Sequence, residues 1–392
     1  MNSAHQISGN QLTLLQSGTE YFPRLCADID AAKHSIYLET YIFAADQTGR
    51  MIADALQRAA ARGVAVRVLL DGYGSSDLPQ QWVDDMRTAE IEVRWFRREI
   101  SPFTLRRNRH RRLRRMHRKM AVMDGEVAFI GGVNIINDIP VHSNFSTPQL
   151  DYAVRIEGLV AGEVHVAMRH LWRVVSWANF RRRGKRIKWL IAGDKRPATS
   201  ANITFLLRDN VRHRRDIERA YMNTIESAER EVIIANAYFL PGSAFRQALT
   251  RAARRGVRVV LLLQGRVEYW IQHYATHALY DELLGAGIEI YEYQASYLHA
   301  KVAVVDGSWA TVGSSNIDPF SLLLAREANL VVQHAGFAEE LRTSLLTAIA
   351  NDAVRVGERY ALKRNWVDRL ISRLSYVVVR LMIGMLGYGR PI

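Results

Sequence analysis

Two stretches of the sequence place the same reactive residue types at the same spacing. In each, a lysine follows a histidine by two positions, an aspartate follows it by seven, and a glycine seven residues later opens a turn that contains an asparagine. The first copy consists of His117, Lys119, Asp124, Gly131 and Asn134, and the second of His299, Lys301, Asp306, Gly313 and Asn316. A single His-x-Lys is common on strands, but two copies with matching downstream spacing indicate a catalytic site.

This set of residues suits the exchange of one phosphodiester for another. A neutral imidazole is a good nucleophile towards phosphorus, and a phosphohistidine intermediate divides a difficult displacement into two easier ones. A second, protonated imidazole could give its proton to the leaving alkoxide and then take one from the incoming hydroxyl. Lysine and asparagine side chains would stabilise the developing charge. The sequence has no clear cluster of metal ligands, so neither a metal nor another cofactor is predicted.

Short strands and a hairpin are expected to position these groups. Residues 116–122 and 298–305 have the apolar pattern of buried strands, and a period of two puts each histidine and its lysine on one face. An Asp-Gly pair and a second apolar run follow each strand, which predicts a hairpin. Asp124 and Asp306 fall where strand meets turn, so we expect them to hold the motif rather than touch substrate.

An acidic residue begins the strand that follows each motif. These residues are Asp151 and Glu327. Either carboxylate could accept a hydrogen bond from the histidine nitrogen that does not react, which would fix the ring's tautomer. A structural salt bridge to a lysine is the alternative explanation.

The motifs belong to a longer internal repeat that predicts an α/β protein of two similar domains. Residues 35–43 match residues 231–239 as a first strand, and in each copy a helix ending in glycine, Gly63 or Gly256, leads into a β-branched strand. Packing about a pseudo-two-fold axis would bring both motifs into one cleft at the domain interface. The predicted divisions are 1–192, a linker at 193–200, a second domain at 201–360, and an amphipathic tail at 361–392.

The charge of the chain predicts an anionic partner. The formal net charge is +14 and the isoelectric point is near 10.0, which suits either a nucleic acid or an anionic membrane surface. The N-terminus lacks the pattern of a signal peptide, and no apolar run reaches the roughly 18–20 residues that span a bilayer. A membrane would therefore be approached from the side.

Three basic or amphipathic segments are candidates for that contact. Residues 97–118 are rich in arginine and would either hold an anionic headgroup or form a solvated loop. Residues 164–180 have helical spacing and lead into a basic run, and tryptophan beside arginine is typical of a membrane interface, although it also suits a nucleic-acid backbone. The tail at 361–392 would be an interfacial helix or a helix docked on the protein. The residues predicted to contact headgroups are Arg106, Arg107, Arg111, Arg112, Trp172, Trp177, Arg181, Arg182, Arg183 and Trp189.

At the two motifs the sequence resembles the phospholipase D superfamily, whose signature is a paired His-x-Lys-x(4)-Asp. It is more closely similar to bacterial cardiolipin synthases of the short type without N-terminal transmembrane helices. The similar stretches are 69–75, 115–119, 129–132, 232–239 and 309–316. The resemblance implies two phospholipase D-like α/β/α domains with the active site between them. It also implies transfer of a phosphatidyl group between two phosphatidylglycerol molecules, giving cardiolipin and glycerol.

The resemblance further assigns roles and a location. It makes His117 the nucleophile and His299 the acid and then the base. It places Lys119, Lys301, Asn134, Asn316 and Ser314 on the phosphate, with Gly132 in the place of Ser314 in the first copy. It implies a peripheral protein of the bacterial cytoplasmic membrane, on its cytoplasmic face, with phospholipid rather than nucleic-acid partners. Phosphatidylethanolamine is an open second substrate, and a phosphodiesterase or nuclease acting on another phosphodiester is the alternative function.

Overall fold

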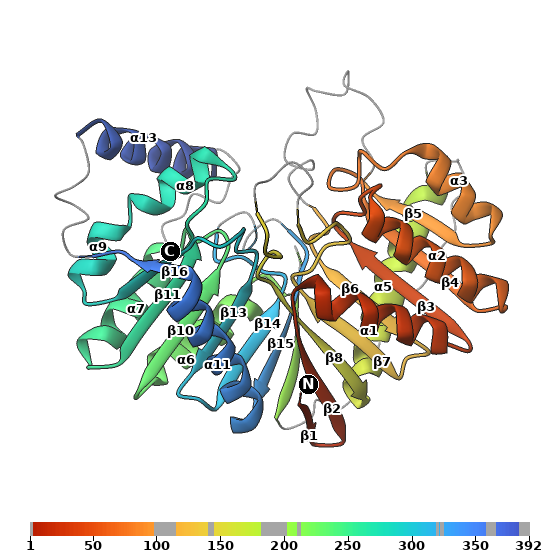
Figure 1. The fold of residues 1–392 in the computed structure, drawn as a ribbon, viewed down its shortest axis with the longest axis horizontal. Helices are drawn as coiled ribbons and strands as arrows, with labels where there is room; N and C mark the ends of the chain where they lie inside the picture. Colours follow the sequence, from red (N-terminus) through yellow and green to blue (C-terminus); the bar gives the residue numbers. More distant parts are fainter. Residues whose placement is uncertain are drawn as a thin grey trace.

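The computed structural model describes residues 3–97, 115–139, 145–181, 202–209, 213–318, 321, 325–357 and 366–383. Two eight-stranded mixed sheets lie side by side, one built by each half of the chain (Figure 1). The predicted linker at 193–200 falls outside the described residues.

The elements of the first half alternate strands with helices before the motif hairpin. They are β1 (Ala4–Ile7), β2 (Asn10–Gln16), α1 (Ser17–Ala31), β3 (Ser35–Thr40), α2 (Gln47–Ala61), β4 (Ala65–Asp71), α3 (Gln80–Thr88), β5 (Glu92–Phe96), β6 (Lys119–Met123), β7 (Val127–Gly131), β8 (Tyr152–Gly158) and α5 (Leu159–Arg181).

The second half repeats that order from β2 onward, with two helices in the place of α3, and adds elements at its end. They are β9 (Ile203–Arg208), α6 (Asp216–Ser227), β10 (Glu231–Asn236), α7 (Ser243–Arg254), β11 (Arg258–Gln264), α8 (Trp270–His277), α9 (Tyr280–Gly285), β12 (Glu289–Tyr293), β13 (Lys301–Val305), β14 (Trp309–Gly313), β15 (Glu327–Gln333), α11 (Ala335–Asp352), β16 (Ala353–Arg355) and α13 (Trp366–Ile383).

The strand orders of the two sheets confirm the predicted pseudo-symmetry. The first sheet runs β2-β8-β7-β6-β3-β4-β5 and the second runs β9-β15-β14-β13-β10-β11-β12, element for element. In both, three parallel strands adjoin antiparallel strands that contain the motif hairpin. The sheets differ only at their edges, where β1 pairs with β2 and β16 pairs with β12.

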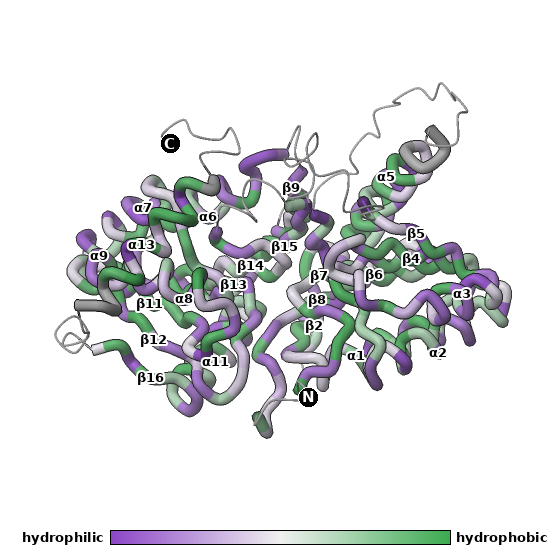
Figure 2. Tube along the Cα trace, turned by 90° about the horizontal axis from the view of Figure 1, so that it is seen from above, coloured by the Kyte–Doolittle hydropathy of each residue, from purple (hydrophilic) through white to green (hydrophobic). Residues whose placement is uncertain are grey.

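Three buried clusters make each half an α/β/α sandwich. One cluster lies between the first sheet and α1 to α3, and a second lies between the second sheet and α6, α7 and α9. The third contains the inner faces of both sheets together with the apolar sides of α5 and α11. In Figure 2 the hydrophobic colouring runs along much of α5. The two halves therefore share their central core, because apolar surface from both is removed from water in one cluster.

The motif hairpins turn tightly where the sequence predicts an Asp-Gly turn. Asp124 and Gly125 have φ angles of 55° and 75°, and Asp306 and Gly307 have φ angles of 52° and 66°. Positive φ at both central residues is the geometry of a type I′ turn, which matches the twist of the flanking strands.

Both turn aspartates tie the hairpin to the start of the neighbouring strand. The Asp306 carboxylate accepts backbone hydrogen bonds from Glu229, Arg230 and Glu231 at 2.9, 2.8 and 2.9 Å. Asp124 accepts the three corresponding bonds at the start of β3. Burial acts to raise the pKa of each carboxyl group, but these N–H donors prevail, so both pKa values lie below 3.8. The aspartates hold the hairpins, as expected, at the end of β6 and β13 away from the histidines.

The motif strands begin later than predicted. β6 starts at Lys119 and β13 at Lys301, so each histidine lies two residues before its strand. The backbone N–H of His117 donates to the Arg326 carbonyl in the other half, at 2.9 Å, instead of joining its own sheet. Strands β2 and β9 are not predicted from the sequence, and they are defined by their pairing with β8 and β15. None of the described helices has the length and apolarity to cross a bilayer.

We expect Asp306→Ala to destabilise the fold without removing a group that takes part in the reaction. Losing three charged-acceptor hydrogen bonds should lower the free energy of unfolding by about 2–4 kcal/mol, measured by urea denaturation at neutral pH. Because the folded-state pKa is lowered, the difference from wild type should shrink as the pH falls below about 4. Asp281→Ala, which alters an exposed carboxylate on α9, is the control. A large loss of turnover with unchanged stability would contradict the structural role.

Candidate active site

The segment before the first histidine is joined to the segment before Glu327. The Arg326 N–H donates to the Arg115 carbonyl at 2.8 Å and the His117 N–H donates to the Arg326 carbonyl at 2.9 Å. Met116 and Arg326 thus form a parallel bridge between the halves. The first motif is fixed to the second half by backbone hydrogen bonds.

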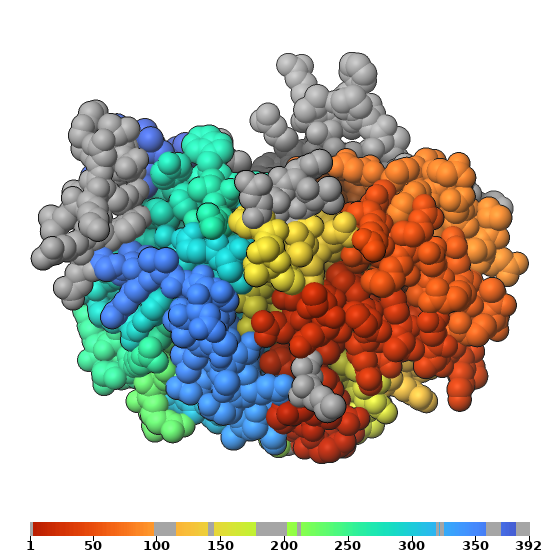
Figure 3. Space-filling model, viewed as in Figure 1, coloured from red at the N-terminus to blue at the C-terminus, as the bar shows by residue number. Residues whose placement is uncertain are grey.

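The second motif is joined to the first half in the same way. The Leu150 N–H donates to the Tyr297 carbonyl at 3.0 Å, and the His299 N–H donates to the Leu150 carbonyl at 2.9 Å. In Figure 3 the chain around residue 150, in yellow, lies between the two halves. The two bridges bring both motifs to the interface, which confirms the predicted position of the site.

Each histidine is oriented by a carboxylate from the opposite half. His117 Nδ1 lies 3.1 and 3.2 Å from the two Glu327 oxygens and 3.2 Å from the Ser314 carbonyl, and His299 Nδ1 lies 2.6 Å from Asp151 Oδ2. Since carboxylates and carbonyls only accept hydrogen bonds, Nδ1 must carry the hydrogen in both rings. Nε2 is left with the lone pair that nucleophilic attack requires. Asp151 and Glu327 therefore occupy the predicted orienting positions, but in crossed pairs.

The two motif lysines are buried beside the histidines. The Lys119 ammonium donates to the His117 carbonyl at 2.8 Å, and the Lys301 ammonium donates to the His299 carbonyl. Their exposed fractions are 2% and 0%. Burial lowers the pKa of both lysines, while Asp151 and Glu327 act to raise it. Two cations and two anions thus share one enclosed site.

The surroundings keep both imidazoles neutral at pH 7. Burial lowers the pKa of His117, and the adjacent Glu327 only partly opposes this effect. Burial and the Lys301 charge lower the pKa of His299 to about 4. A neutral ring is the nucleophilic form. A bound phosphodiester brings negative charge, which favours the imidazolium, so substrate itself would raise the pKa of the histidine that donates a proton.

Ser314, which is predicted to bind the phosphate, makes its hydrogen bonds within the protein. Its hydroxyl donates to Glu327 Oε2 at 2.6 Å and accepts from the Ala328 N–H at 3.0 Å, and the residue is fully buried. Ser314 positions Glu327. In the first motif the same place is held by Gly132, whose hypothetical Cβ would lie 2.2 Å from Asp151 Oδ1. The glycine is required there because the Asp151 carboxylate fills the space.

The two motif asparagines lie on the histidine side of the sheets. Asn134 follows β7 and is 8% exposed, and its Oδ1 accepts from the Ile42 N–H at 3.3 Å. Asn316 follows β14 and is 3% exposed, and its Oδ1 has no hydrogen-bond partner within the described part of the chain. Among the described residues, no group of histidine, cysteine and carboxylate side chains could hold a metal ion.

Sequence reasoning missed three residues that support the histidines. Asp71 Oδ2 accepts from the Met116 N–H at 2.8 Å, and Gln264 Oε1 accepts from the Leu298 N–H at 3.1 Å. Each bond fixes the residue that precedes a histidine. The repeat alignment contains the signal, because both residues end the second strand of the repeated βαβ unit and are followed by glycine. Tyr41 was also missed, although its ring lies 4.8 Å from the His117 ring.

The predicted headgroup contacts have mixed outcomes. Trp172 is buried, with its ring edge-on to Tyr37 at 6.4 Å and beneath the Arg94 guanidinium at 4.2 Å, so the prediction that it contacts a membrane is wrong. The reason is that α5 turns this face onto the first sheet. Trp177 is 38% exposed. The remaining predicted side chains lie outside the described part of the chain: Arg106, Arg107, Arg111, Arg112, Arg181, Arg182, Arg183 and Trp189.

The duplicated fold and the crossed pairs of histidine and carboxylate define a class of proteins that transfer a phosphodiester with two paired motifs. Comparisons with known proteins agree with this class. Residues 25–143 and 221–347 match the family model described as "Cardiolipin synthase, PLD-like domain". Cardiolipin synthase B of Escherichia coli K12 is 39% identical, with 97% of this chain and 90% of that protein covered. Cardiolipin synthase A of Erwinia tasmaniensis is 30% identical, with 94% and 75% covered.

A solved structure has the same fold. The crystal structure of phosphatidylserine synthase from Haemophilus influenzae superposes with a TM-score of 0.70 over 98% of this chain and 96% of that chain, at 13% identity. The chain belongs to the cardiolipin synthase family of the phospholipase D superfamily. The predicted enzyme class, a phosphatidyltransferase, is confirmed.

We expect Glu327→Gln to lower turnover by roughly 10³–10⁴-fold, because an amide can donate to Nδ1 and favour the wrong tautomer of His117. Removing the carboxylate also removes the charge that favours imidazolium, so the pKa of His117 should fall further. The fall of kcat/KM at acidic pH should therefore move to lower pH. The measurement is the pH dependence of kcat/KM in wild type, Glu327→Gln and a control variant. Glu157→Gln, at an exposed carboxylate on β8, should behave as wild type; a wild-type rate in Glu327→Gln would remove Glu327 from the mechanism.

Proposed function

We propose that this chain transfers a phosphatidyl group from one phosphatidylglycerol to a hydroxyl of a second, forming cardiolipin and glycerol. The observation that carries the proposal is the pair of crossed His-carboxylate contacts, at 3.1 Å for His117 and 2.6 Å for His299, which leave two Nε2 atoms available in one site. The curated relatives bear the name of this activity.

The first step forms a phosphohistidine. Nε2 of His117 attacks the donor phosphorus and the bond from phosphorus to the glycerol oxygen breaks. His299, which becomes an imidazolium when the anionic substrate binds, gives its Nε2 proton to the departing alkoxide. The Lys119 and Lys301 ammonium groups and the two motif asparagines would stabilise the negative charge of the transition state. The lysines suit this role because they are held in place by the carbonyls of the histidines that they flank.

The second step reverses the first with a new alcohol. The acceptor hydroxyl gives its proton to His299 and attacks the phosphorus, and the bond from phosphorus to His117 breaks. The product carries the phosphatidyl group on the acceptor, and both imidazoles return to their starting protonation states. Water in place of the acceptor would give phosphatidic acid, so the identity of the alcohol decides the product.

Helix α13 supports a peripheral contact with an anionic membrane. It packs on α8, as Figure 1 shows, and its Val379 is buried in the core of the second half. The Tyr376 hydroxyl lies 3.5 Å from the Arg246 guanidinium. Its opposite face is apolar and exposed, and it comprises Leu370, Leu374, Val377, Val378 and Leu381. This pattern fits a helix that rests in the lipid headgroup layer.

The charges on α13 complement such a surface. Arg373 and Arg380 are exposed on the same helix, and the chain carries a net charge of +14. Basic residues beside exposed leucines favour an anionic bilayer, because each contributes about 1 kcal/mol of attraction at its surface. We place the protein on the cytoplasmic face of a bacterial cytoplasmic membrane.

We expect purified protein and phosphatidylglycerol vesicles to yield cardiolipin and glycerol in equal amounts. His117→Ala and His299→Ala should each lose at least about 10³-fold in rate, because a nucleophile or a general acid is removed. Donor labelled in the phosphatidyl group should leave label on His117 in the His299→Ala variant after a quench. Absence of cardiolipin together with cleavage of labelled DNA would favour a nuclease instead.

We expect Leu374→Glu with Leu381→Glu to weaken binding to anionic vesicles by at least about tenfold, because two leucines of the exposed face would no longer enter the lipid. Co-sedimentation measures this binding. Activity in detergent micelles should be retained. Val354→Glu changes an equally exposed apolar residue on β16 and serves as control; equal loss in the control, or none in the double variant, would remove α13 from the interface.

A further inference from the structure

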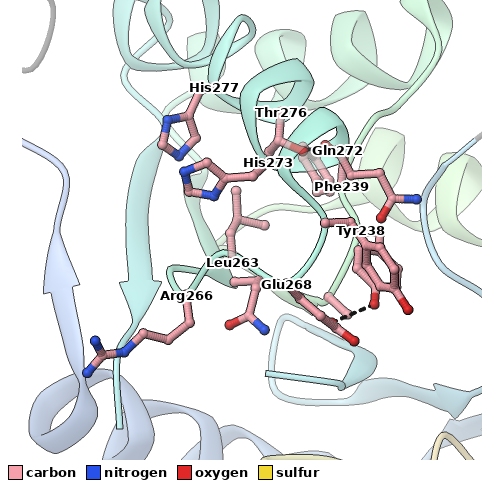
Figure 4. Close-up of a pocket in the computed structure, with 12 residues that line it drawn as sticks. Tyr238, Phe239, Leu263, Arg266, Glu268, Gln272, His273, Thr276 and His277 are labelled. Atoms are coloured by element: carbon pink, nitrogen blue, oxygen red, sulfur yellow. Dashed lines mark hydrogen bonds between the residues drawn. The ribbon is translucent and has the colours of Figure 1, made fainter. Parts of the chain in front are cut away.

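A small pocket opens in the second half beside the active site. It lies at the carboxyl ends of β10 and β11, beneath α8 (Figure 4), which is where ligands commonly bind in α/β folds. Its enclosed volume is about 20 Å³, enough for one water molecule or one hydroxyl group. The polar residues that line it include Tyr238, Gln264, Glu268 and Gln272.

The pocket is connected to the second motif. Gln264 Oε1 accepts from the backbone N–H of Leu298, the residue before His299, at 3.1 Å. The Glu268 carboxylate and the Lys301 ammonium attract each other. A group bound in the pocket would therefore lie next to the histidine that activates the acceptor alcohol.

Two residues that line the pocket each have a buried polar atom without a partner. Gln264 Nε2 and Gln272 Oε1 make no hydrogen bond with any described residue. The bond to Leu298 fixes the orientation of the Gln264 amide, so its free atom is the donor Nε2. A buried donor without an acceptor costs roughly 1–3 kcal/mol, so a ligand that supplies the missing partner is favoured.

The first half has no such free donor at the equivalent position. Asp71 stands where Gln264 stands in the repeat, and its Oδ2 accepts from the Met116 N–H at 2.8 Å. Its Oδ1 accepts from the N–H groups of Tyr73 and Gly74 at 2.9 and 3.1 Å. Backbone N–H groups thus satisfy both carboxylate oxygens of Asp71. At this position the second half, unlike the first, therefore offers a polar atom for a ligand, which distinguishes two otherwise symmetric sides of the site.

We propose that this pocket binds a hydroxyl of the neutral polyol headgroup of the acceptor, next to the hydroxyl that reacts. Gln264 Nε2 donates to that oxygen, and the hydroxyl donates in turn to Gln272 or to Glu268, which is held by the Tyr238 hydroxyl at 2.7 Å (Figure 4). A hydroxyl both donates and accepts, whereas an ammonium group has no acceptor for Gln264. An anionic phosphate would meet the Glu268 carboxylate. This inference rests on the proposed phosphatidyl transfer and names its selective subsite.

The test compares soluble acceptors that differ by one hydroxyl. Purified full-length protein is given phosphatidylglycerol vesicles with 1,2-propanediol or 1-propanol, and the two phosphatidyl-alcohol products are quantified. Wild type should prefer the diol. Gln272→Leu and Glu268→Gln should each lower that preference by about tenfold, the effect of one hydrogen bond to the substrate. Transfer to 1-propanol should change much less, because this alcohol has no second hydroxyl for the pocket to hold.

Controls separate the pocket from general damage. Tyr291→Phe removes another tyrosine–glutamate hydrogen bond, 2.9 Å long, elsewhere in the same half, and should keep the wild-type preference. Glu268 is exposed enough for Glu268→Gln to fold, as a thermal melt would verify. An unchanged diol preference in both pocket variants overturns the subsite but leaves phosphatidyl transfer intact. Absence of any phosphatidyl-alcohol product from wild type overturns the proposed function and the subsite with it.

Discussion

The arrangement of the site depends on one constraint, which is that the imidazole of each motif is held by a carboxylate of the other half. Glu327 reaches His117 and Asp151 reaches His299, and backbone bonds on either side bind the same segments together. Neither half therefore contains a complete site, although each has its own sheet and its own outer core. The apolar cluster that α5 and α11 share with both sheets supplies the packing that keeps the two halves in register.

Charge balance explains how so many ionisable groups can be buried together. Removing a charge from water costs several kcal/mol, and it is tolerated when opposite charges and hydrogen bonds surround it. Here Lys119 and Lys301 face Asp151 and Glu327, and both imidazoles are neutral in the absence of substrate. An incoming phosphodiester changes this balance by one negative charge. The site is thus prepared for an anion, and the same anion supports protonation of the ring that must act as an acid.

The near-symmetry of the molecule is broken where substrates must differ. Ser314 supports Glu327 in one copy, while Gly132 leaves room for the shorter Asp151 in the other. The Asp71 carboxylate accepts from Tyr73 in its own loop and from Met116, whereas its counterpart Gln264 keeps a free donor. A symmetric site would bind both lipids alike, and a transferase must tell donor from acceptor at each step. Under the proposed phosphatidyl transfer, these small exchanges at equivalent positions supply that distinction while the fold is retained.

The sequence by itself determined the local features, because these follow from spacing and periodicity. It was sufficient for the repeated βαβ units, the Asp-Gly hairpins, the paired motifs and the acids at 151 and 327. Only the tertiary structure decided which acid serves which histidine, since that depends on how two halves distant in sequence pack. The same holds for Trp172, whose helix face is chosen by the neighbouring sheet, and for Ser314, which meets Glu327 across paired strands. Contacts between distant segments carry no local signal, and here they complete the site.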